Sequence, residues 1–233
     1  MNKNLWVYPV ILVTILLNYG LTIKNAPNKK NNSFNNTKIS NEYFPVDVNK
    51  TMIYDSDFGE TALSSTQENG YSIYTFKGDD FTYRQKLIIN NEGVFVKETY
   101  QKLKVLLVFN KEGTFTYNEP LPRIKFPMLP GNSWNWKGKE YDDGEINSIE
   151  LTARVEANET IQVPAGTFNT IKLVTSIKSS SGTENTVTEW FAKNVGLIKM
   201  SADIKGGGLI GMLRDLSGLG SIEFELAKIE TDK

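Results

Sequence analysis

Alternation of apolar and polar side chains is clearest between residues 148 and 204. Every second residue of Ile149–Ala157 is apolar, and the residues between them are polar or charged. Successive side chains of an extended chain point to opposite faces, so this period of two predicts a strand with one buried face. A turn is expected at Pro164–Thr167. Further strands of an antiparallel meander are expected at 171–177, 186–192 and 198–204, with a turn at 193–196.

Shorter alternating segments precede this region. Glycine-bearing turn sequences at Asn90–Gly93 and Asn110–Gly113 favour hairpins there. The expected strands are 71–76, 81–89, 94–100, 103–109 and 115–117, with a last strand at 222–226. Many short strands with such turns predict an all-β, mainly antiparallel fold, either a curved meander sheet, an incomplete or closed barrel, or a sandwich.

A proline-rich segment, 119–130, is expected to interrupt the strand ladder because proline lacks the amide donor. It is also a possible boundary between two similar halves, 42–118 and 119–233. Shifting the sequence by 82 residues aligns Phe44–Pro45 with Phe126–Pro127 and Tyr54 with Trp136. A duplicated half-unit is therefore a hypothesis.

The first 41 residues differ from the rest. Residues 1–23 contain an apolar run from Leu5 to Leu17, which is typical of a signal peptide or a signal anchor. Residues 24–41 are rich in Asn, Lys and Ser and are expected to be a disordered linker. The β domain then spans 42–233. The protein is expected to be exported to the periplasm or cell surface, or membrane-anchored if the signal is not cleaved.

Composition limits the possible chemistry. The 233-residue chain contains no His and no Cys. These absences exclude Ser-His-Asp and cysteine catalysis, thiolate or histidine metal sites, disulfides and a lipid-modified cysteine. The formal net charge of −1 offers no general attraction for nucleic acid or an anionic membrane. We expect no nucleic-acid partner, no cofactor and no metal.

Three motifs resemble a known group of proteins. They are Phe126–Trp136 (FPMLPGNSWNW), Val163–Phe168 (VPAGTF) and Trp190–Lys199 (WFAKNVGLIK). In this order they resemble signatures of a broad family of uncharacterised exported bacterial β-rich domains, over about residues 120–230. That family is distantly similar to the curved antiparallel sheets of lipoprotein carriers, which hold acyl chains. The resemblance therefore implies an exported domain with a curved sheet that can hold a hydrophobic ligand, and no catalytic residue is carried over from it.

Candidate ligand-binding residues come from two places. Residues 206–220 carry apolar side chains at helical spacing and predict a short amphipathic helix or loop, which either covers an apolar cavity or fills the end of the sheet. The tryptophans of the motifs are core residues, edge residues or ligand contacts. The candidates are Trp134, Trp136, Trp190, Leu209, Met212, Leu213 and Leu216.

Two acidic clusters, Asp55–Glu60 and Glu140–Glu145, are calcium candidates that also fit solvated turns. The leading hypothesis is an exported cell-envelope protein that binds or carries a hydrophobic molecule such as a lipid. The alternatives are an envelope structural or protein-interaction module, and a carboxylate-based hydrolase.

Overall fold

The computed structural model describes residues 42–105, 109–142, 144–205 and 221–231. These residues form strands joined by turns, and no helix occurs among them. The strands are β1 Lys50–Ser56, β2 Gly59–Glu68, β3 Tyr71–Lys77, β4 Phe81–Asn90, β5 Gly93–Val105, β6 Phe109–Lys125, β7 Ser133–Asp142, β8 Glu145–Val163, β9 Gly166–Ser179, β10 Glu184–Ala192, β11 Gly196–Lys205 and β12 Ser221–Thr231.

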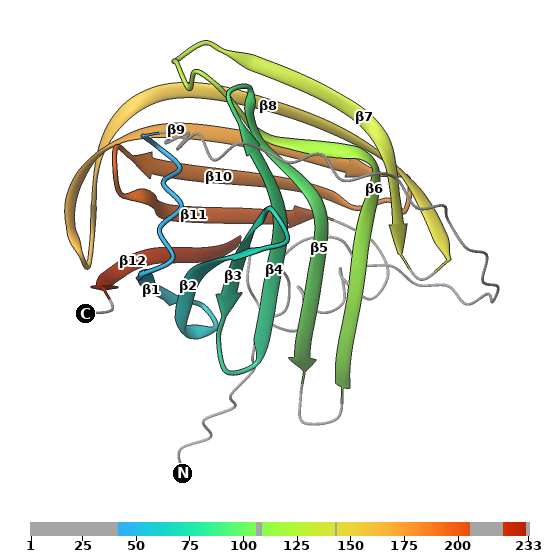
Figure 1. The fold of residues 1–233 in the computed structure, drawn as a ribbon, viewed down its shortest axis with the longest axis horizontal. Coiled ribbons are helices and arrows are strands. Elements are labelled where there is room, and N and C mark those ends of the chain that lie inside the picture. Colours follow the sequence, from blue (N-terminus) through green and yellow to red (C-terminus); the bar gives the residue numbers. More distant parts are fainter. Residues whose placement is uncertain (1–41, 106–108, 143, 206–220, 232–233) are drawn as a thin grey trace.

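The strands form a closed antiparallel barrel. Each strand pairs with the next in sequence, and β12 pairs with β1, so the sheet closes on itself. Figure 1 shows this succession from β1 in blue to β12 in red. Closure removes the exposed strand edges that an open curved sheet would present. The expected all-β curved sheet is confirmed, and it is a closed barrel.

Strand β8 shows why the alternating pattern folds in this way. Ile149, Leu151, Ala153 and Val155 are each no more than 2% exposed, whereas the residues between them are exposed. A register shift between Val155 and Asn158 then bends the strand. A bulge of this kind increases local curvature, which allows one 19-residue strand to follow the barrel wall. The meander expected for residues 148–204 is confirmed.

The prediction of a hairpin turn at Asn110–Gly113 was wrong. These residues lie inside β6 and pair with β5, for example Gln101 with Gly113. The two strands expected at 94–100 and 103–109 are largely one strand, β5. Glycine at 113 suggested a turn, but the pairing between two long strands outweighs that local preference.

The proline-rich segment interrupts one ladder without ending the strand. Strand β6 continues to Lys125 and pairs with β5 through Pro122, beside two register shifts. Among the described residues, its pairing with β7 comprises Phe115, Thr116 and Tyr117. Proline is tolerated at bulges and edges because no amide is needed there. Few backbone pairs therefore join β6 to β7 in the barrel wall, and we call this region the β6–β7 seam.

Residues 42–49 close one end of the barrel. Phe44 stacks on Tyr74 of β3 at 4.9 Å and lies 6.2 Å from Phe191 of β10, as measured between ring centroids. The guanidinium carbon of Arg123, on β6, lies 5.3 Å from the centre of the Phe44 ring. Because these strands are on different sides of the barrel, Phe44 occupies its interior. We call this the plugged end, and the opposite one the far end.

The proposed half-units of 42–118 and 119–233 stay a prediction. The sequence repeat places Phe44–Pro45 ahead of β1 and Phe126–Pro127 ahead of β7, with six strands from each start. The expected signal segment 1–23, linker 24–41 and helix or loop within 206–220 lie outside the described residues. Within the described part of the chain, no helix is long and apolar enough to cross a membrane.

Candidate functional site

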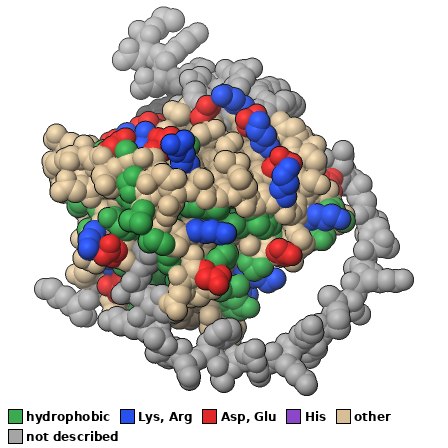
Figure 2. Space-filling view, turned by 90° about the horizontal axis from the view of Figure 1, so that it is seen from above, with side chains coloured by type: hydrophobic (Ala, Val, Ile, Leu, Met, Phe, Trp, Pro, Cys, Tyr) green, Lys and Arg blue, Asp and Glu red, His purple; other side chains and the backbone are tan. Residues whose placement is uncertain are grey.

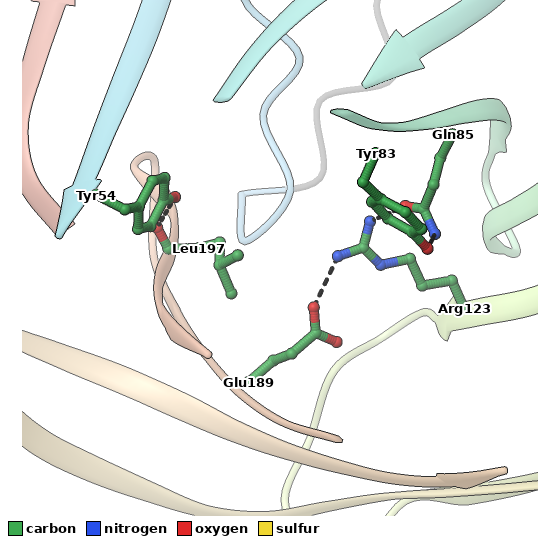
Figure 3. Close-up of polar contacts among 6 residues, drawn as sticks. All are labelled: Tyr54, Tyr83, Gln85, Arg123, Glu189 and Leu197. Carbon is green, nitrogen blue, oxygen red and sulfur yellow. Dashed lines mark hydrogen bonds and ion pairs between the residues drawn. The ribbon is translucent and has the colours of Figure 1, made fainter. Parts of the chain in front are cut away.

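A cluster of polar side chains crosses the barrel interior. Arg123 Nη2 donates to Glu189 Oε1 over 2.7 Å, and Arg123 Nη1 donates to Gln85 Oε1. The Gln85 amide in turn donates to the Tyr83 hydroxyl over 2.8 Å. Figure 3 shows Arg123 between Glu189 on one side and the Tyr83–Gln85 pair on the other. The cluster thus joins β4, β6 and β10, which are not neighbours in the sheet.

Strand alternation brings these residues inside. On β10, Val187, Glu189 and Phe191 share the inward face, and Glu189 is only 5% exposed. Glu189 therefore lies at a position where the alternation of β10 predicts an apolar residue. A charge at an inward position is retained in folded proteins when it is paired. Arg123 supplies that partner.

The electrostatics follow from burial and from this ion pair. Burial is the largest single influence on the pKa of Arg123 and lowers it, but the charge and hydrogen bond of Glu189, with smaller effects of Tyr83 and Tyr74, raise it, and the net shift is upward. Burial raises the pKa of Tyr74 and of Tyr83 to about 12, with Arg123 opposing and Glu189 reinforcing the shift. Arg123 is therefore cationic and the two tyrosines are neutral at physiological pH.

A cavity of about 90 Å³ lies next to the polar cluster. It is not sealed from solvent. Its wall is apolar except for the cluster and a few uncharged polar groups. The lining residues are Phe76, Tyr83, Gln85, Val96, Thr99, Tyr117, Leu121, Arg123, Leu151, Thr175, Ile177, Val187, Glu189, Met200 and Ala202. An apolar wall with a few convergent polar groups is the usual composition of a small-molecule site.

Two buried amides lie among the inward-facing residues towards the far end. Asn185 follows the same face of β10 as Val187 and is 1% exposed, and Asn147 of β8 is 7% exposed. Asn185 Oδ1 and Asn147 Nδ2 have no hydrogen-bond partner among the described residues. Buried polar atoms are normally satisfied, and an ordered water can supply a bond to each of these two atoms.

The predicted tryptophans lie in two different environments. Trp134 and Trp136 share one face of β7 at the β6–β7 seam. The Trp134 indole donates to the Pro122 carbonyl over 3.0 Å, and the Trp136 ring meets Tyr117 edge-on at 6.1 Å. Tyr117 lines the cavity, whereas the described lining contains none of the tryptophans. A role for Trp134 and Trp136 in ligand contact stays a prediction.

Trp190 lies on the outer face of the barrel, next to Glu189 in sequence. Its indole donates to Glu159 over 2.8 Å, and the ammonium groups of Lys172 and Lys199 lie 5.6 and 5.9 Å from its rings. Lysines at this distance from an indole face stabilise it by cation–π attraction. Trp190 is thus held within a charged surface, and its role as a ligand contact stays a prediction.

The other candidates cannot be placed. Leu209, Met212, Leu213 and Leu216 lie outside the described residues. Within the residues that the structure describes, no three acidic side chains are grouped so that they could hold a metal ion. The central residues of the interior cluster were missed from the sequence. Glu189 could have been identified from the sequence, because it is a carboxylate that alternates with the apolar residues Val187 and Phe191 on the inward face of the strand.

The fold and interior define a closed, up-and-down antiparallel barrel with a small, mostly apolar cavity and an internal ion pair. A family described as DUF3108-like matches residues 131–213, which overlap the stretch from Phe126 to Lys199 that carries the three motifs. No curated protein matches the chain.

Two solved structures are similar to this chain. One is a candidate lipoprotein from Parabacteroides distasonis, with 14% identity, a TM-score of 0.38, and coverage of 81% of this chain and 98% of that chain. The other is a candidate exported protein with a YmcC-like fold from Bacteroides fragilis, with 14% identity, a TM-score of 0.37, and coverage of 81% and 99%.

Proposed function

We propose that this protein is an exported, non-enzymatic β-barrel domain whose interior binds a hydrophobic or amphipathic small molecule in the cell envelope. The observation that carries the proposal is the cavity of about 90 Å³ inside the barrel. Small barrels usually fill their interiors with side chains, so retained space beside a fixed polar cluster favours a ligand. Export is supported by the apolar run at Leu5–Leu17 and by the motif resemblance.

The cavity chemistry favours binding over catalysis. Its described lining contains a single carboxylate, Glu189, and that group is paired with Arg123. A two-carboxylate hydrolase needs one acid that can protonate the leaving group and a second that attacks or activates water. The sequence has neither His nor Cys to replace them. The lining thus supplies contacts and no reacting pair.

Filling the cavity tests the proposal. Ala202 lines it and is 1% exposed, so Ala202→Phe places a ring in the space. Ser201→Phe adds the same ring on the opposite face of β11 and is the matched control. The full chain, produced in a bacterial host that exports it, is examined by native mass spectrometry against a denatured sample.

A co-purifying mass that is present in the wild type and in Ser201→Phe but absent from Ala202→Phe supports the proposal. A ligand-free wild type that also takes up no added amphiphile overturns it. Ala202→Phe must first show a folded β-sheet spectrum, because overpacking commonly costs about 1–3 kcal/mol.

A second candidate function is a protein-interaction module of the envelope. It is favoured by Trp190, a large aromatic residue held on the outer face between Lys172 and Lys199. Tryptophan is enriched among the residues that dominate binding at protein interfaces. On the face seen in Figure 2, acidic and basic side chains lie next to one another with apolar side chains between them. Trp190→Ala should then abolish partner binding and leave ligand uptake unchanged.

A further inference from the structure

We propose that the cavity selects amphiphiles with an uncharged polar head group, such as a primary amide or an alcohol, and rejects both carboxylates and ammonium ions. This inference rests on the proposed function and specifies its ligand class. Two charged residues, Arg123 and Glu189, occur in the described lining, and they pair with each other at 2.7 Å. The remaining polar lining residues are uncharged. The net charge of the described lining is therefore zero.

Burial of a third charge in this lining is unfavourable. A carboxylate ligand could reach the guanidinium only by competing with Glu189, and an ammonium ligand could reach the carboxylate only by competing with Arg123. Either exchange leaves one of the three charges without a partner, away from water. Such a group carries a large desolvation penalty, which the binding of a small ligand has to overcome.

An uncharged head group can bind without breaking the pair. The arginine side chain has five N–H donors. Glu189 and Gln85 each accept one of these bonds within the cluster. A carboxylate can accept several hydrogen bonds, and Glu189 receives one from Arg123. A primary amide or a hydroxyl both donates and accepts, so it can accept from Arg123 and donate to Glu189 at the same time.

The polar end of the site is held in a fixed position. Gln85 fixes one side of the guanidinium, Glu189 fixes another, and the Phe44 ring lies 5.3 Å from it at the plugged end. The rest of the cavity is bordered by apolar side chains such as Leu151, Ile177 and Met200. A ligand head group therefore fits against Arg123 and Glu189, and its tail against the apolar wall.

The size of the cavity limits what is enclosed. A volume of about 90 Å³ is smaller than the roughly 150 Å³ cavity that holds a benzene molecule in an engineered protein core. The head group and the first carbons of a tail fill such a space. The remainder of a longer tail extends through the opening, because the cavity is not sealed.

The test is isothermal titration of the full chain with three probes that share a tail: hexanamide, hexanoate and hexylammonium, at neutral pH. The wild type should bind hexanamide about ten-fold more tightly than either ion, a difference of about 1.4 kcal/mol. Glu189→Gln removes the negative charge and keeps the side-chain shape. Hexanoate should then gain about ten-fold relative to hexanamide, because Arg123 has lost its partner. Glu150→Gln is the control, since Glu150 pairs with Lys137 on the outside and is 58% exposed.

A second variant covers the case in which Glu189→Gln does not fold. The double replacement Arg123→Met with Glu189→Leu exchanges the pair for apolar groups of similar size, which folded proteins often tolerate. Preference for hexanamide over the two ions should fall at least several-fold in this protein.

The outcomes separate this inference from the proposed function. Suppose that the three probes bind the wild type and that Ala202→Phe excludes them. If their affinities for the wild type are then equal, or if hexanoate binds most tightly, the head-group inference is overturned and binding in the cavity still stands. An unchanged order of affinities in Glu189→Gln also overturns the inference. If none of the three probes binds the wild type, the head-group inference is overturned, and the co-purifying mass in native mass spectrometry decides the proposed function separately.

Discussion

The Arg123 guanidinium lies 2.7 Å from the Glu189 carboxylate inside the barrel, and their side chains are only 12% and 6% exposed. The two residues come from β6 and β10, which are separated by three strands in the sheet order. The ion pair therefore links opposite walls across the interior. It fixes the polar end of the cavity and joins strands that are not neighbours in the sheet.

Breaking this pair should destabilise the fold. Glu189→Leu leaves Arg123 as a buried charge without its carboxylate, so the free energy of unfolding should fall by about 3–5 kcal/mol. Adding Arg123→Met should recover most of that loss, because both charges are then gone. Guanidinium-chloride denaturation measures both values. Glu150→Leu, which breaks an exposed pair with Lys137, should cost less than about 1 kcal/mol. Equal losses for Glu189→Leu and Glu150→Leu would contradict this account.

Phe44 should be essential to the plugged end. Its ring is 2% exposed and contacts residues from three strands. Phe44→Ala should lower the free energy of unfolding by about 3–5 kcal/mol, as expected for an aromatic ring removed from a packed core. Val48 lies in the same segment and is 51% exposed, so Val48→Ala should change stability by no more than about 0.5 kcal/mol. A Phe44→Ala protein as stable as Val48→Ala would show that residues 42–49 do not plug the barrel.

The strands of the barrel wall could be predicted from the sequence, whereas the interior polar cluster could not. Alternation at 149–157 reports directly which side chains are buried, since one face meets the core and the other meets solvent. The pairing of Arg123 with Glu189 depends on how strands 66 residues apart curve towards each other. Closure itself rests on long-range pairing of β1 with β12, which local patterns do not encode. The turn expected at Asn110–Gly113 failed for the same reason.

Alkaline pH should destabilise the protein through its buried tyrosines. The pKa of Tyr74 and of Tyr83 is about 12 in the folded protein, against a usual value of 10.0. In the unfolded chain these groups lose their protons near pH 10, whereas in the folded protein they keep them until about pH 12. The stability they contribute is complete below pH 10 and is lost as pH rises from 10 to 12, by about 1.4 kcal/mol per pH unit for each tyrosine.

This loss is measured by denaturation at several pH values, together with tyrosinate absorbance of the folded protein. Tyr83→Phe should flatten the pH dependence between 10 and 12 relative to the wild type, because phenylalanine does not titrate. Tyr141→Phe is the matched control, since Tyr141 is 37% exposed. If all tyrosines of the folded protein titrate together near pH 10, the buried environment described here is wrong.

The position of the Trp136 indole should require glycine at residue 138. A Cβ atom at residue 138 would lie 2.3 Å from Trp136 Cζ2, so the indole covers the glycine at the β6–β7 seam. Gly138→Ala should displace the indole from Tyr117 and destabilise the protein by about 1–3 kcal/mol. In a Trp136→Ala background the same change should cost markedly less. Additive effects in this double-mutant cycle would contradict the contact.

The most direct measurement for the central claim is an NMR titration of the isotope-labelled full chain with hexanamide. Binding inside the barrel predicts amide shift changes on the strands that carry Thr99, Thr175 and Val187, all of which line the cavity. The same titration of Ala202→Phe should show none of these changes. Shift changes confined to the outer face around Trp190, or a wild-type spectrum unaffected by hexanamide, would contradict the claim that the barrel interior is the binding site.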